Sequence, residues 1–212
     1  MKCNALRFLS VSALLISTTA RAQFFTLEPD NFTNNAVLDH ALAPVSLITA
    51  LSDNQPVSIF DITATYDSLG YTSTGTNVFG HVGIPFFNSD RRLRMDFAAP
   101  VTGISIDFIG GEFFSTEVGQ LDAYNNLGQL IGSYTTGALA AGNVETMSVL
   151  NPAGNIAWAV AYIPPNLGSF GRLDNLRFTV VPEPTAAGLM TIGGIVLQAR
   201  TCKRRQQKIN SR

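Results

Sequence analysis

The stretch between residues 23 and 181 contains no cysteine and no lysine. Both cysteines of the chain, Cys3 and Cys202, and all three lysines lie outside it. A disulfide-stabilised scaffold is therefore excluded for this stretch, and so is a zinc site built on thiolates. The stretch must rely on an ordinary apolar core, and a single domain of this length can build one.

Positive charge is also scarce in this stretch. Its five arginines stand against fourteen Asp and Glu residues, which leaves a net charge of −9. Such an acidic domain repels phosphate backbones and anionic lipids, so we expect no nucleic acid partner. The other basic residues of the chain lie in its two ends, which therefore need an explanation of their own.

No apolar run in the chain reaches the roughly 20 residues that cross a bilayer comfortably. At the N-terminus a positive region, a short apolar segment and small residues follow one another: Lys2 and Arg7, residues 8–16, then Ala20 and Ala22. This order is the layout of a secretory signal peptide. We expect signal peptidase to cut between Ala22 and Gln23, so that residues 1–22 leave the exported protein.

The C-terminus has a different three-part order. A Pro-Glu-Pro element, an apolar segment and a basic tail occupy Pro182, Glu183 and Pro184, residues 186–199 and residues 200–212. The first basic residues of the tail are Arg200, Lys203, Arg204 and Arg205. By the positive-inside tendency, this cluster should halt translocation and stay cytoplasmic while the domain is held outside the membrane.

Residues 181–205 resemble the PEP-CTERM sorting signal, in which motif, apolar segment and basic tail occur together. The resemblance implies recognition of Pro182, Glu183 and Pro184 by an exosortase, an inner-membrane cysteine peptidase. Removal of the tail would pass the protein to the envelope or exterior of a Gram-negative, often biofilm-forming, bacterium. The prolines also keep the segment extended, as a peptidase requires. The short apolar segment would then be a transient inner-membrane anchor; a plain linker before a permanent anchor is the alternative.

Between the two ends, apolar and polar residues alternate with a period of two. The alternating segments are residues 60–66, 93–97, 104–108, 156–162 and 175–180, with turn-forming residues between them. This pattern predicts antiparallel strands with one buried face. In IAWAVAY we expect the large residues, including Trp158, to face the core and the three alanines to face outward. Residues 124–130 predict a hairpin, because Asn and Gly tolerate a positive φ.

The predicted fold is an all-β, antiparallel, two-sheet jelly-roll-like sandwich over residues 23–180. The order of four segments resembles the strand sequence of galactose-binding-like jelly rolls: LRMDFAAPVTGISIDFIG, LDAYNNLGQLIGS, IAWAVAY and GRLDNLRFTV. Such domains are common in PEP-CTERM proteins and in carbohydrate-binding modules. The resemblance also implies a structural Ca²⁺, for which Asp39, Asp53 and Asp174 are candidate ligands, because a hard cation prefers oxygen.

Catalytic motifs are scarce in the same stretch. The only two histidines, His40 and His81, are not in a metal-binding pair, and a Gly-x-Ser-x-Gly elbow is missing. We expect His81 to be a solvated or hydrogen-bonded loop residue. A glycosidase needs two facing carboxylates, and Asp96 and Asp107 alternate with apolar residues as solvent-facing strand residues do. The other available carboxylates are Glu112, Glu117 and Asp122.

Sugar binding requires exposed aromatic rings beside polar groups. Two doublets, Phe86-Phe87 and Phe113-Phe114, lie between glycine and polar residues, and neighbours in a strand point to opposite faces. One ring of each doublet is therefore a candidate glycan contact, although a loop that closes the end of the sandwich explains them equally. Arg91 and Arg92, with Arg94, form the only positive cluster between residues 23 and 181. They suit anionic sugars or, equally, balance the surrounding acidic residues.

Three functions agree with these features. The first is a non-enzymatic, exported protein of the cell envelope or extracellular matrix that binds polysaccharide. The second is a small secreted glycan-active enzyme that uses a carboxylate pair. The third is a purely structural surface protein.

Overall fold

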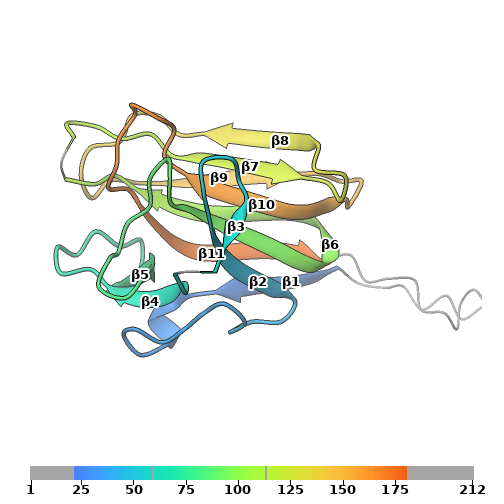
Figure 1. The fold of residues 1–212 in the computed structure, drawn as a ribbon, viewed down its shortest axis with the longest axis horizontal. Helices are drawn as coiled ribbons and strands as arrows, with labels where there is room; N and C mark the ends of the chain where they lie inside the picture. Colours follow the sequence, from blue (N-terminus) through green and yellow to red (C-terminus); the bar gives the residue numbers. More distant parts are fainter. Residues whose placement is uncertain (1–21, 59, 113, 181–212) are drawn as a thin grey trace, which may run out of the picture. The chain divides into compact units, whose positions relative to one another are not determined.

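The computed structural model describes residues 22–58, 60–112 and 114–180, and Ala22–Pro182 forms one compact unit. The predicted sorting signal and nearly all of the predicted signal peptide lie outside the described residues. Eleven strands and one 3-10 turn make up the regular structure of the described residues (Figure 1). They are β1 (Gln23–Leu27), η1 (Pro29–Asn31), β2 (Val45–Ala50), β3 (Pro56–Val57), β4 (Thr63–Tyr66), β5 (Asn77–Gly80), β6 (Arg92–Ile109), β7 (Gln120–Tyr124), β8 (Leu130–Thr135), β9 (Val144–Leu150), β10 (Ile156–Tyr162) and β11 (Arg172–Val180). Within the described part of the chain, no helix is long and apolar enough to cross a membrane.

Strand β6 belongs to both layers of the sandwich. Its first half, residues 92–97, pairs with β2 and β10, and its second half, residues 101–109, pairs with β9 and β11. The strands predicted at 93–97 and 104–108 are therefore one continuous strand. Pro100, which is exposed and has no N–H to donate, lies between the halves, where a strand can bend from one layer into the other.

The two layers follow from this pairing. One layer has the order β3–β2–β6–β10–β7–β8, and the other has β4–β5–β11–β6–β9 with β1 beside β11. Every strand pair is antiparallel. The predicted all-β, antiparallel, two-layer architecture is confirmed. The hairpin predicted at 124–130 is confirmed too: it joins β7 to β8, and Gly128 has a φ of 73°.

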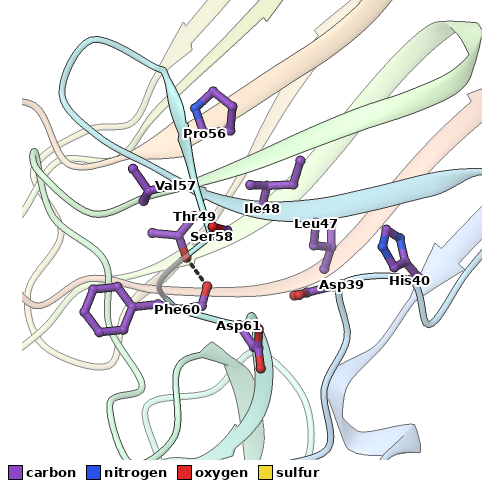
Figure 2. Close-up of a pocket in the computed structure, with 10 residues that line it drawn as sticks. All are labelled: Asp39, His40, Leu47, Ile48, Thr49, Pro56, Val57, Ser58, Phe60 and Asp61. Carbon is purple, nitrogen blue, oxygen red and sulfur yellow. Dashed lines mark hydrogen bonds between the residues drawn. The ribbon is translucent and has the colours of Figure 1, made fainter.

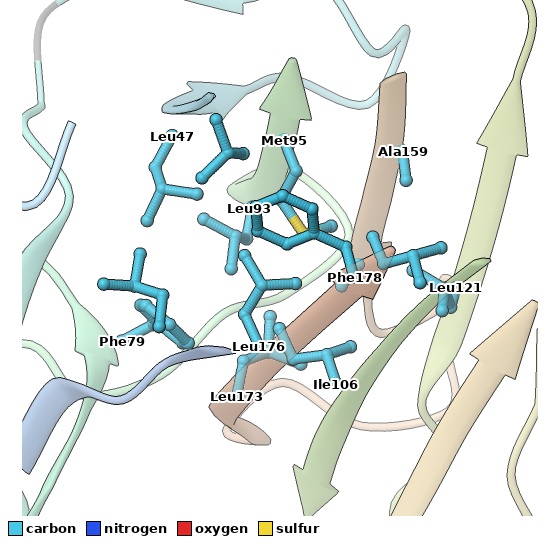
Figure 3. Close-up of a cluster of buried hydrophobic side chains, with 14 of the residues drawn as sticks. Leu47, Phe79, Leu93, Met95, Ile106, Leu121, Ala159, Leu173, Leu176 and Phe178 are labelled. Atoms are coloured by element: carbon cyan, nitrogen blue, oxygen red, sulfur yellow. The ribbon is translucent and has the colours of Figure 1, made fainter. Parts of the chain in front are cut away.

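The core lies between the two layers (Figure 3). β6 contributes Leu93 and Met95 from its first half and Ile106 from its second, and Phe178 of β11 is also fully buried. Each such side chain contributes about 1.5–3 kcal/mol by leaving water. The ring of Phe178 stacks on Phe25 of β1 at 5.2 Å, which holds the first strand of the domain against the last.

In strand β10, the face that packs against the core is the opposite of the predicted one. Ala159 and Ala161 are fully buried in the core, whereas Trp158 and Tyr162 are only half-buried on the outer face. The expectation that Trp158 is buried is wrong. A register shift in the pairing with β6 falls between Ile156 and Trp158 and changes the phase of the alternation, so Ile156 faces the core although Trp158 does not.

Candidate functional site

Aromatic and arginine side chains cover the outer face of the layer that contains β10. We call this group the outer row: Arg92 and Arg94 of β6, Trp158 and Tyr162 of β10, and Tyr124 of β7. Tyr124 is the Cα partner of Trp158, and their rings stack at 3.9 Å with an angle of 8°. The guanidinium carbon of Arg94 lies 4.2 Å from the centre of the Trp158 ring, and that of Arg92 lies 3.9 Å from the centre of the Tyr162 ring. Each arginine thus fixes one ring through a cation–π contact.

A buried carboxylate anchors the row on the β7 side. Asp122 accepts hydrogen bonds from the Tyr162 hydroxyl at 2.9 Å, from Ser133 Oγ at 2.7 Å and from Gln120 Nε2 at 2.7 Å. Burial raises the pKa of Tyr162, and the negative charge of Asp122 raises this pKa further. The hydroxyl of Tyr162 therefore stays protonated and acts as a donor at physiological pH.

The loop between β2 and β3 reaches over the row through Asn54, a residue that sequence reasoning missed. Its side-chain oxygen accepts from Arg92 Nη1 at 2.7 Å, and its backbone oxygen accepts from Arg94 Nη1 at 3.0 Å. Its amide nitrogen donates to the Tyr124 hydroxyl at 3.1 Å. Asn54 has a φ of 63°, a left-handed conformation that Asn adopts more readily than most residues. One loop residue therefore connects three members of the outer row.

The two phenylalanine doublets do not form a shared platform in the described residues. Phe87 is fully buried, as the closing-loop alternative expects, and Phe86 is half-buried against Phe170 at 4.6 Å. Phe114 is exposed, and Phe113 lies outside the described residues.

The predicted arginine cluster is divided between two places. Arg91 is half-buried, with its guanidinium over the ring of Phe86 at 4.9 Å, and it donates to the Phe86 carbonyl. Arg92 is buried in the outer row together with Arg94, which is half-buried. The arginines that contact the half-buried rings of the outer row are therefore Arg92 and Arg94, and the sequence alone did not separate them from Arg91.

The three candidate calcium ligands lie in different environments. Asp39 lines a pocket beside β2, and exposed Asp53 accepts the Gln55 N–H at 2.9 Å. Asp174 is fully buried in β11. Within the described ranges, no three His, Cys, Asp or Glu side chains gather in a group that could hold a metal ion.

Asp174 has a carboxyl partner that the sequence did not suggest. Its Oδ2 accepts hydrogen bonds from the Ser73 N–H and hydroxyl and from the Thr74 N–H. Glu28 lies beside it, and burial followed by the charge of Asp174 raises the pKa of Glu28 to about 7. Because the folded state then holds a proton that the unfolded chain has released, this pair opposes folding once the pH exceeds the ordinary pKa of a glutamate.

Most carboxylates considered for glycoside hydrolysis already have partners. Asp107 is buried rather than solvent-facing, because it pairs with Arg177 and accepts from Thr146 Oγ1. Asp96 pairs with Arg94 at 2.8 Å, and Glu117 is fully buried among backbone N–H groups. Asp122 belongs to the network described above, which leaves Glu112 exposed.

His81 is buried, not solvated, at the edge of the core. Its Nδ1 bonds to the Asp61 carbonyl at 3.0 Å, which agrees with a hydrogen-bonded histidine. Burial lowers the pKa of His81, so the ring is neutral at physiological pH.

Comparisons with known proteins leave this antiparallel sandwich without an assigned family. No protein-family model and no curated protein matches the sequence. Solved structures with a similar chain path include the K2 cleaved adhesin domain of Lys-gingipain, with 14% identity over 74% of this chain and 100% of that one, at a TM-score of 0.44. The xylan-binding module CBM15 has 13% identity over 71% and 99% of the two chains, at a TM-score of 0.40. The CBM22-1–GH10 modules of Clostridium thermocellum xylanase 10B have 9% identity over 75% and 28%, at 0.36. With such low identities and TM-scores, these similarities do not indicate what this chain binds.

Proposed function

We propose that this protein is a non-enzymatic, exported component of the cell envelope or extracellular matrix, and that it binds polysaccharide through the outer row. The observation that carries the proposal is the combination of three half-buried aromatic rings with guanidinium, amide and carboxylate groups on one sheet face. A sugar ring has apolar C–H faces and polar hydroxyl edges, and such a surface can contact both kinds of group.

The rigidity of the row supports binding rather than a merely soluble surface. Trp158 lies between Tyr124 and the guanidinium of Arg94, and Asn54 fixes both neighbours by hydrogen bonds. Because these side chains are already held in place, they lose little conformational entropy when a ligand binds. Val160, whose Cα partners are Arg94 and Asp122, is fully buried although it is not part of the core cluster between the layers, so side chains of the outer face cover it.

Replacing Trp158 with alanine tests this binding site. The variant should lose at least about tenfold in affinity for a bound polysaccharide, the loss expected when a central aromatic anchor is removed. Affinity electrophoresis of the purified protein against a panel of neutral, acidic and amine-bearing polysaccharides, followed by calorimetry on any ligand found, measures the effect. Phe24→Ala is the matched control, because Phe24 is 63% exposed on β1 in the other layer. Unchanged affinity in Trp158→Ala, or a panel with no ligand, would contradict the proposal.

We further propose that the chain reaches its destination by signal-peptidase and exosortase processing. The support is the sequence order described above, with Pro182, Glu183 and Pro184 before an apolar segment and a basic tail. In an exosortase-bearing host, intact mass should give a product that begins at Gln23, ends near Pro182 and lies in the outer envelope or medium. Replacing Pro182, Glu183 and Pro184 together with alanine should leave the tail attached. A wild-type product that keeps its tail in the inner membrane would overturn the sorting proposal.

A further inference from the structure

A pocket of about 400 Å³ lies at the edge of β2 (Figure 2). Its lining comes from β2, β3, the chain that follows β3 and the turn before β2: Asp39, His40, Leu47, Ile48, Thr49, Pro56, Val57, Ser58, Phe60 and Asp61. The volume falls within the range of small-ligand sites, which is roughly 300–1,000 Å³. Half of the lining residues are apolar, and Phe60 is 47% exposed, so the pocket offers an aromatic side chain to a ligand.

The lining of the pocket carries two carboxylates, Asp39 and Asp61. Asp39 Oδ1 accepts the Ile62 N–H at 2.8 Å, which fixes this carboxyl group at the wall of the pocket. Burial raises the pKa of Asp39 and the charge of nearby Asp61 raises it further, while the Ile62 N–H and the charge of His40 act in the opposite direction. No ion pair within the described part of the chain includes either carboxylate, and the lining contains no lysine or arginine. His40, the one basic residue of the lining, is exposed and bonds to Ser46 Oγ at 3.1 Å.

The charge and the apolar side chains of the lining indicate which class of ligand fits the pocket. A hard metal ion needs six to eight oxygen ligands in proteins such as calcium-binding modules, and this wall presents two carboxyl groups among apolar side chains. An organic cation is better matched, because its charge can pair with Asp39 and Asp61 while its body packs on Ile48, Val57 and Phe60.

The pocket and the outer row are neighbours in the same layer. Ile48 lines the pocket and is the Cα partner of Arg94, whose guanidinium lies over Trp158. β2 and β10 flank β6, so their axes are about 10 Å apart. The pocket therefore lies at the edge of the same layer, one strand away from the arginines of the outer row.

We propose that this pocket binds a saccharide unit that carries a protonated amine, as an extension of the polysaccharide site on the outer row. The proposal rests on the proposed function and adds a ligand class to it. The amine pairs with Asp39 and Asp61, and the apolar face of the sugar packs on Phe60. A neutral or N-acetylated unit leaves both carboxylates without a cationic partner.

Two sets of oligosaccharides test this assignment with the full protein: glucosamine oligomers and N-acetylglucosamine oligomers of equal length. At about pH 6, below the ordinary pKa of an amine, calorimetry should show about tenfold or more tighter binding of the glucosamine oligomer. Asp39→Asn and Asp61→Asn should each remove most of that preference and leave the weaker N-acetylglucosamine binding unchanged. Asp39→Asn keeps an oxygen for the Ile62 N–H, and Asp61 is exposed, so neither change should unfold the domain. Asp53→Asn, an exposed residue outside the pocket lining, is the matched control and should bind like the wild type.

The possible failures are distinguishable. Equal binding of the two oligomers, or a preference that survives both Asn variants, overturns the amine assignment but leaves the outer row as a glycan site. The amine assignment is also overturned if Trp158→Ala loses all binding while Asp39→Asn and Asp61→Asn still prefer the glucosamine oligomer. Tighter binding of an oligolysine peptide than of the glucosamine oligomer overturns the saccharide assignment. No binding of either oligomer also overturns the amine assignment, and the polysaccharide panel then decides the proposed function independently.

Discussion

Replacing Glu117 with alanine is expected to destabilise the domain by about 3–5 kcal/mol, as removal of one partner from a buried charged network does. Glu117 is fully buried before β7 and accepts three backbone N–H groups: Gly111 at 2.6 Å, Ser169 at 3.1 Å and Phe170 at 2.9 Å. One carboxylate therefore joins the chain that follows β6 to the chain that precedes β11. The loss is large because each buried N–H that loses its acceptor costs about 1–3 kcal/mol.

Urea denaturation of the wild type and the variant measures this difference as a change in midpoint at constant slope. Glu112→Ala is the control, because this glutamate lies in the same connection and is exposed. It should change the free energy of unfolding by less than about 0.5 kcal/mol. If Glu117→Ala unfolds at the same urea concentration as Glu112→Ala, the carboxylate does not hold these two connections together.

Removing Asp67 is expected to have a comparable effect, because Arg172 is then left charged and buried. Arg172 Nε donates to Asp67 Oδ2 at 2.6 Å, and the exposed fractions of the two side chains are 3% and 1%. The ring of Tyr71 lies 5.1 Å from the guanidinium carbon and closes the other side. Asp67→Ala should cost about 3–5 kcal/mol, since breaking a buried pair leaves an uncompensated charge.

A double-mutant cycle separates the ion pair from the packing. Asp67→Leu combined with Arg172→Met should be less destabilised than the sum of the two single variants, because neither charge is then left alone. Asp96→Asn is the control at the half-exposed pair with Arg94 and should cost less than about 1 kcal/mol. Additive single effects would show that Asp67 and Arg172 stabilise the fold independently of each other.

Strand positions followed from the sequence because alternation depends only on which residues are apolar. Leu93, Met95 and Phe178 are buried where the period of two places them. The joining of 93–97 to 104–108 was not predictable in the same way, because a proline such as Pro100 usually argues against a continuous strand. Pairing on both sides of the proline, with β10 and then with β9, makes it a bend.

The outer row could not be derived from alternation alone. In AWAVAY either set of side chains can face the core, and hydrophobicity favours the set that contains Trp158. The structure selects the alanines, because a register shift after Ile156 changes the phase and the two layers leave room for small residues at Ala159 and Ala161. Asn54 gives no sequence signal at all, since its partner Tyr124 is 70 residues away.

In the part of the chain that the structure describes, strand β1 pairs only with the last strand of the domain, so completion of the sheet depends on the order in which the strands can fold. Gln23 at the start of the domain pairs with Val180 at its end, so the first strand has no partner until the last strand has been delivered. Pairings of such long sequence separation give a high contact order, and β-sandwiches of this kind fold in milliseconds to seconds rather than in microseconds. A chain exported as proposed would emerge N-terminus first, and its leading strand would wait unpaired while the rest of the domain is translocated. In such an export, slow completion of the sheet would leave the chain unfolded enough to be translocated, and the arrival of β11 would complete the fold.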